Sequence, residues 1–68
     1  MPNFKPTIKP IGESKFYTNG QTFATEAEAR QSAKNRYCNW MMAEAFGVEE
    51  SDEPVNYAWV DGQGDVHL

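Results

Sequence analysis

The sequence predicts a small α+β fold in which two β-hairpins form a four-stranded sheet with one central helix on one face (ββαββ). Three observations predict it. A long helical periodicity runs from residue 25 to residue 47, an Asn-Gly pair at residues 19–20 separates two alternating segments, and a DGQG turn at residues 61–64 separates two more. We expect residues 15–68 to form a single domain, preceded by an extended, proline-containing arm over residues 1–14.

The central helix has a marked start and a marked end. Thr25 is an N-cap residue with Glu28 three positions later, so its hydroxyl can accept the Glu28 backbone N–H while the Glu28 carboxylate reaches back to the Thr25 amide. Gly47 follows the last apolar residue, as a left-handed residue after a helix would. At 100° per residue, one line of side chains forms the core face: Ala29, Ala33, Tyr37 and Trp40. The small alanines come first, and the bulky aromatic side chains fill a wider gap towards the end of the helix.

The second half of this helix is more apolar than one sheet can cover. Eight of the ten residues from 37 to 46 are apolar, and Cys38, Met42 and Phe46 project away from the core face. One interpretation is that the N-terminal arm or the loop after Val48 covers them. The other is that they contact another protein, because methionine and aromatic residues are enriched in such contact surfaces.

The arm over residues 1–14 is expected to be extended. Pro2, Pro6 and Pro10 recur at four-residue intervals, which excludes a stable helix and does not supply the PxxP spacing of a proline-rich recognition motif. Phe4 and Ile8 could pack along the sheet edge or against the helix. A partly ordered terminus is the simpler interpretation, and a partner-binding segment is the alternative.

The two expected hairpins place aromatic residues under the helix. In the first, a type I′ turn at residues 19–20 pairs Phe16 with Phe23 on the face towards the helix. In the second, residues 55–60 run into the turn and return through residues 65–68, which places one apolar set on a common face: Val55, Tyr57, Trp59, Val66 and Leu68.

Between the helix and the second hairpin lies an acidic segment formed by Glu49, Glu50, Asp52 and Glu53. It lacks the glycine turn and closing bidentate carboxylate of a calcium loop, so we expect no metal site. It is either a solvated loop or an acidic contact surface that steers a partner. The net charge of −4 is uneven, because residues 1–37 carry all six Lys and Arg whereas residues 38–68 carry seven of the ten acids.

No catalytic or cofactor site is expected. His67 is the only histidine and has no histidine or cysteine partner in the sequence, and no nucleophile can be matched with a base. Cys38 cannot form an internal disulfide, and its acidic or neutral surroundings in mid-helix favour a small hydrophobic residue over a nucleophile. No segment has the length and hydropathy of a membrane span or a signal peptide, so we expect a cytoplasmic protein without membrane contact.

Two segments together resemble a class of small bacteriophage proteins of unassigned function. These are FYTNGQTFATEAEA and NRYCNWMMAEAFGVEESDEPVNYAWVDG, which cover residues 16–62 with a hairpin, an alanine-rich helix ending in aromatic residues and a D-x-PVNY-x-W strand. The resemblance implies a setting rather than a chemistry, namely a small accessory protein that binds a host protein in the host cytoplasm.

The function hypothesis from the sequence is a small non-enzymatic protein-binding module, which binds or inhibits a host factor or self-associates as a homodimer. Its expected contact residues are Cys38, Met42, Phe46, Glu49, Glu50, Asp52 and Glu53. The alternative is a nucleic-acid-binding protein that uses the basic first half with an exposed aromatic residue for stacking, although the overall acidity makes nucleic acid the less favoured partner. Its residues would be Lys5, Lys9, Lys15, Tyr17, Arg30, Lys34 and Arg36.

Overall fold

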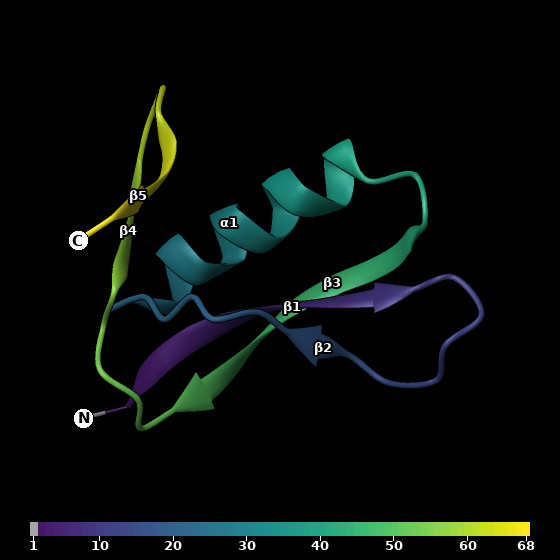
Figure 1. Cartoon of the computed structure of the whole chain (residues 1–68), viewed down its shortest axis with the longest axis horizontal. Helices are drawn as coiled ribbons and strands as arrows, with labels where there is room; N and C mark the ends of the chain where they lie inside the picture. The colour runs from purple at the N-terminus through teal and green to yellow at the C-terminus, as the bar shows by residue number, and fades with distance from the viewer. Residues whose placement is uncertain (1) are drawn as a thin grey trace.

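The computed structural model describes residues 2–68. Within them the chain forms one helix and five strands, with two strands before the helix and three after it (Figure 1). In chain order the elements are β1 (Asn3–Pro10), β2 (Tyr17–Thr18), α1 (Glu26–Asn39), β3 (Ala43–Ser51), β4 (Tyr57–Val60) and β5 (Gly64–His67).

The strands form two separate antiparallel sheets rather than one. The larger sheet has the order β2-β1-β3, and β4 pairs only with β5. Helix α1 contacts β1 and β3 of the larger sheet and both strands of the smaller one, and Figure 1 shows the β4–β5 hairpin standing beside the first half of the helix. The α+β class with one helix is therefore confirmed, whereas the single four-stranded ββαββ sheet is wrong.

Strand β1 comes from the segment expected to be an arm, and it is the middle strand of the larger sheet. Phe4 exchanges both backbone hydrogen bonds with Phe23, at 2.9 and 2.7 Å, so its amide and carbonyl point away from β3. Alternation along the strand then turns the nitrogens of Pro6 and Pro10 the same way. The prolines therefore remove no donor from the β3 side, where residues such as Lys5 complete the ladder.

Helix α1 begins as expected and ends seven residues earlier than Phe46. Thr25 is the N-cap, and its hydroxyl accepts the Glu28 backbone N–H at 3.2 Å. The helix stops at Asn39, where Trp40 takes an extended conformation, and residues from Ala43 onward form β3. The predicted extension to residue 47 is wrong because Phe46 pairs with Ile8 across the sheet, a long-range contact that overrides local helix propensity.

The Asn-Gly pair does not make the predicted hairpin turn. Gly20 is not among the residues with positive φ, and the Asn19 side chain instead accepts the Gln21 backbone N–H at 3.0 Å, as in an Asx-turn. Strand β2 instead pairs antiparallel with the preceding strand β1, and the connection between them includes Gly12 at φ 88°. Consequently the predicted Phe16–Phe23 pair is wrong.

The C-terminal hairpin lies where the sequence predicts it. Gly62 and Gly64 have positive φ at the turn, with values of 88° and 81°. The register, however, sets Tyr57 opposite His67, so Val66 lies opposite Ala58 on the other face. The expected common face of Tyr57, Trp59 and Val66 is wrong because the turn holds three residues between Val60 and Gly64, which shifts the returning strand by one position.

Residues 21–23 connect the two sheets and the helix. Phe23 is fully buried between its bridge to Phe4 and the Tyr57 ring, whose centroid lies 6.2 Å away. The Thr22 carbonyl accepts the backbone N–H groups of Asn56 and Tyr57 at 3.1 and 3.2 Å. The helix approaches this region closely through alanine, as expected, and the buried apolar core is small: Ile8, Phe23, Ala29 and Ala33.

This burial separates two phenylalanines that the hairpin prediction treats as equivalent. We expect Phe23→Leu to lower the free energy of unfolding by about 1–2 kcal/mol because it leaves a cavity at the junction, and Phe23→Ala to lower it by about 3–5 kcal/mol. Phe16→Ala is the control and should change it by less than about 1 kcal/mol, since Phe16 is 47% exposed. Urea unfolding measures all three, and equal losses for Phe16→Ala and Phe23→Ala would contradict this packing.

Candidate binding site

Bulky apolar side chains are exposed where α1 ends and β3 begins. Met41 is 94% exposed and Met42 is 54% exposed, values far above those of a folded core. Neighbouring side chains of the same kind extend this surface across the β1–β2 connection and the helix end. We refer to the set as the apolar end: Ile11, Tyr17, Tyr37, Trp40, Met41 and Met42.

Short backbone contacts hold the apolar end in place. The Trp40 carbonyl accepts the Ala43 N–H at 3.1 Å, which closes the tight turn that carries both methionines. The Met42 carbonyl accepts the Ile11 N–H at 2.7 Å, so the end of β1 is tied to the start of β3. Met41 and Met42 both lie in this turn, between the end of α1 and the start of β3.

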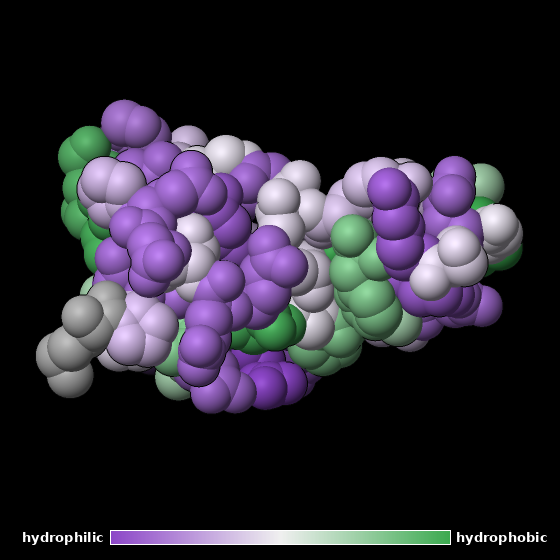
Figure 2. All heavy atoms as spheres, turned by 90° about the horizontal axis from the view of Figure 1, so that it is seen from below, coloured by the Kyte–Doolittle hydropathy of each residue, from purple (hydrophilic) through white to green (hydrophobic). Residues whose placement is uncertain are grey.

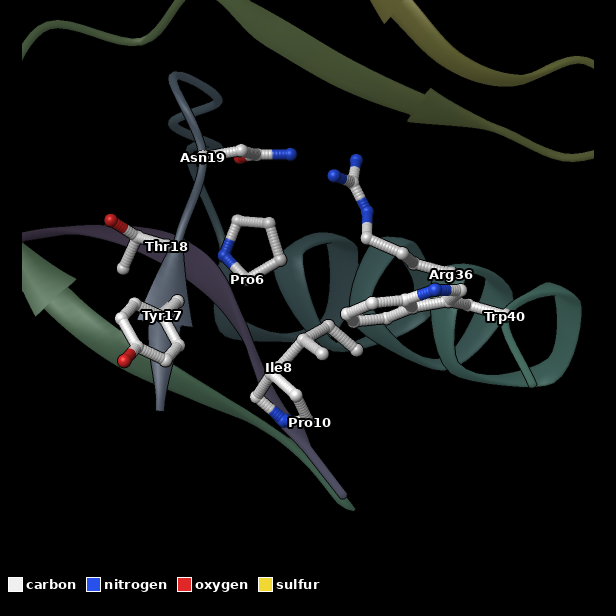
Figure 3. Close-up of a pocket in the computed structure, with 8 residues that line it drawn as sticks. All are labelled: Pro6, Ile8, Pro10, Tyr17, Thr18, Asn19, Arg36 and Trp40. Carbon is white, nitrogen blue, oxygen red and sulfur yellow. The ribbon is translucent and has the colours of Figure 1, made fainter. Parts of the chain in front are cut away.

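A groove of about 240 Å³ runs along one flank of the apolar end. Figure 3 shows side chains from β1 along its floor, the Trp40 ring beside Ile8, and the Arg36 guanidinium turned towards the Asn19 amide at one end. Residues from three elements line the groove: Pro6, Ile8, Pro10, Tyr17, Thr18, Asn19, Arg36 and Trp40.

The groove is open because the sheet has little material on this side of β1. Strand β2 has only two residues, paired with Thr7 and Ile8. Pro6 and Pro10 turn their nitrogens to this edge and offer no N–H there, so a longer β2 would gain few hydrogen bonds. Trp40, which lines this groove, and Tyr37 were both expected in the core, but they remain 42% and 36% exposed.

A polar network closes the groove at its Arg36 end. The Gln21 side-chain carbonyl accepts from Asn19 Nδ2 at 2.7 Å, from Arg36 Nη2 at 2.8 Å and from the Ser32 hydroxyl at 3.4 Å. The Gln21 amide nitrogen donates to Asp65 Oδ2 at 2.7 Å, and Arg36 lies 3.7 Å from the same oxygen. This network fixes the Arg36 side chain and ties the smaller sheet to the helix.

The structure divides the contact residues that the sequence predicts. Met42 belongs to the apolar end, and Phe46 lies beneath it, half-buried against Tyr37 with ring centroids 5.2 Å apart. Cys38 is exposed on another side of the helix, in a shallow depression that Trp59 also lines. Met42 and Phe46 therefore come together, and Cys38 does not join them.

The four acidic residues lie at the far end of β3 from Met42. Glu49 and Glu50 are exposed strand residues, and Asp52 and Glu53 follow the strand. The expected acidic loop is thus partly a strand. Lys5, whose side chain is only 9% exposed, lies 2.7 Å from the Glu53 carboxylate, and the hydrogen bond and charge of this lysine hold the pKa of Glu53 below its ordinary value.

The cations of the nucleic-acid alternative are mostly paired with carboxylates. Within residues 2–68, ion pairs join Lys5 to Glu53, Lys9 to Glu44, Arg30 to Glu26 and Arg36 to Asp65. That pairing leaves Lys15 and Lys34 as the cations without an ion pair in the described chain. Because phosphate binding depends on clustered, available cations, this arrangement disfavours that function.

Hydrophilic and hydrophobic residues occupy different parts of the surface. In Figure 2, which views the molecule from below, hydrophilic residues cover most of the wider part, and hydrophobic surface lies at both ends and where the molecule narrows.

Among residues 2–68, no three His, Cys, Asp or Glu side chains are grouped so as to hold a metal ion. No helix in this part of the chain is long and apolar enough to cross a membrane.

Comparison with known proteins gives no relative: no family model, curated protein or solved structure matches the chain.

Sequence reasoning missed several residues of the groove and the apolar end. Met41 fell within the expected helix and Ile11 within the expected arm, because the helix was extended too far and β1 was not recognised as a strand. The available signal was the short alternation of Phe46 and Val48 with Gly47 and Glu49, which indicates a strand after residue 42. Recognising that strand would have placed Met41 in a turn.

The Lys5–Glu53 pair gives a pH-dependent prediction. Because the folded-state pKa of Glu53 is lowered, its contribution to stability is present above the unfolded-state pKa and is lost as the pH falls through the folded-state pKa. We expect carboxyl NMR titration to give Glu53 a pKa below 4.5, and Lys5→Met to raise it towards the ordinary value. A Glu53 pKa unchanged by Lys5→Met would contradict the assigned cause.

Proposed function

We propose that the protein is a small non-enzymatic binding module whose apolar end contacts another protein. The observation that carries the proposal is the exposure of Met41, Met42 and Trp40 together on a 68-residue chain with few buried apolar residues. A chain this small has little apolar surface to spare, and contiguous exposed apolar patches mark sites of protein contact.

The chemistry of the apolar end fits a protein partner. Trp40, Tyr17 and the two methionines combine large contact area with adaptable shape, and these residue types are enriched at protein interfaces. The groove beside them, at about 240 Å³, has room for one or two bulky side chains of a partner. Arg36 and Asn19 supply polar groups at its end, where a partner's backbone carbonyl could be bound.

The partner we propose is a different protein that inserts an apolar side chain into the groove. The resemblance to small bacteriophage proteins supports a bacterial host protein in this role, and inhibition of that protein is the corresponding effect. Self-association through the apolar end is the competing occupant. The two differ in a measurable quantity, because a homodimer doubles the mass of 7.7 kDa.

We expect Met41→Asp combined with Met42→Asp to weaken partner binding at least about thirtyfold, because it places charge in the centre of the contact. Stability should change little, since both side chains are more than half exposed. The measurement is calorimetric titration with a partner captured from a bacterial lysate and then purified.

Val60→Asp is the matched control, because Val60 is 39% exposed on β4, away from the apolar end. It should leave binding unchanged. Equal binding by the double variant and the wild type would refute the proposal. A wild-type dimer that the double variant converts to a monomer would assign the surface to self-association instead.

A further inference from the structure

The outer edge of β3 has no neighbour. Strand β3 is nine residues long, is the last strand of the order β2-β1-β3, and contacts only β1 and α1 among the elements of the described chain. Such an edge presents unpaired N–H and C=O groups and is a template for another strand.

The register identifies which backbone groups are free. Phe4 points its amide and carbonyl towards Phe23, so the Phe4–Glu50 pair is one in which neither residue bonds to the other strand. Glu50 therefore points its own N–H and C=O outward, and alternation gives the same direction to Val48 and Phe46. No hydrogen bond to these three backbones from outside the β1–β3 ladder is present in residues 2–68.

The side chains at this edge are acidic and mostly unpaired. Glu49 and Glu50 are exposed on opposite faces of the strand near its end, and Asp52 follows them. In residues 2–68 none of these three forms an ion pair, whereas Glu44 and Glu53 are already paired with Lys9 and Lys5. The free end of the edge is thus negatively charged on both faces.

We propose that the β3 edge binds a basic, extended segment of another protein by strand addition. Backbone hydrogen bonds to residues 46, 48 and 50 supply the attachment, and Lys or Arg side chains opposite Glu49 and Glu50 supply the charge complement. Apolar side chains opposite Phe46 and Val48 complete the pairing. This surface lies on the other edge of the sheet from the groove, so the proposal is independent of the function proposed for the apolar end.

A second copy of this chain is a poorer occupant of the same edge. Full-length antiparallel pairing of β3 with itself would set Glu50 of each copy opposite Glu44 of the other, and like charges directly opposite each other are destabilising. A basic segment would instead place positive charges opposite the acidic side chains of β3. The acids therefore favour a heterologous strand over self-association.

The test uses a labelled peptide, Lys-Arg-Val-Thr-Ile-Thr, designed to pair antiparallel with β3. Its first residue lies opposite residue 50 and its last residue lies opposite residue 45. In this register the Lys, Val and Ile amides face β3 and the Arg and Thr amides face away. Two matched analogues carry the same number of N-methyl groups, one on Val and Ile and the other on the two Thr residues. Anisotropy titration of the intact protein gives the affinity of each.

We expect N-methylation of Val and Ile to weaken binding at least about tenfold, and N-methylation of the Thr residues to leave it within about threefold. Glu49→Gln combined with Glu50→Gln should also weaken binding and flatten its salt dependence. The double aspartate variant of the apolar end should bind the peptide normally, which separates this proposal from the proposed function.

Three outcomes would overturn the inference. Equal affinities of the two N-methylated analogues would indicate charge attraction without strand pairing. Absence of saturable binding would indicate that the edge binds no basic strand and that the acidic side chains only prevent edge-to-edge association. A wild-type dimer whose Phe46, Val48 and Glu50 amides are protected from hydrogen exchange would show that a second copy already occupies the edge.

Discussion

The hydrogen bonds of residues 21–23 are the constraint on which the rest of the structure depends. The two sheets share no strand pairing with each other, and this segment contacts both. Asn56 extends the contact by imitating a neighbouring strand: its side-chain oxygen accepts the Thr22 N–H and its amide donates to the Gly20 carbonyl, each at 2.7 Å. Thr22 is almost fully buried, so an unmade bond there would leave a polar group without water.

The same segment places the helix. Phe23 fills the space under the alanine face, and two residues later Thr25 begins the helix. Glu28 was expected to return to the Thr25 amide; instead its carboxylate accepts the Thr25 hydroxyl at 3.0 Å and the Trp59 backbone N–H at 3.0 Å. The Glu28 carboxylate thus holds the hydroxyl of the N-cap residue Thr25 and also binds β4 of the smaller sheet.

What the sequence predicts correctly is local. The N-cap at Thr25, the alanine face and the DGQG turn each depend on residues within a few positions of one another, and all three are present in the structure. The errors concern long-range pairing. Proline at four-residue intervals was taken to indicate an extended arm outside the sheet, but even spacing directs every missing donor to the same edge, which a central strand tolerates if that edge is barely paired.

The candidate site shows the same limit. Met42 and Phe46 could be found from the sequence as surplus apolar residues. Their neighbours from distant parts of the chain, such as Ile11, depend on β1 pairing with β3. The acidic residues were found as a group, yet their position relative to Met42 depends on whether residues 43–51 are helix and loop or strand. A nine-residue strand is about 30 Å long, which is enough to turn one predicted surface into two.

Those two surfaces lie on either side of β1 in the larger sheet. Strand β1 has a proline-limited edge on one side, where β2 stops early and the groove stays open, and a complete ladder on the other, where β3 is left as an unpaired edge. A partner at the groove and a strand at the β3 edge would therefore contact opposite sides of the same sheet without competing for space. Because Met41 and Glu49 are both exposed and neither is part of the buried core, substituting either one tests its proposed surface while residues 21–23 keep the fold intact.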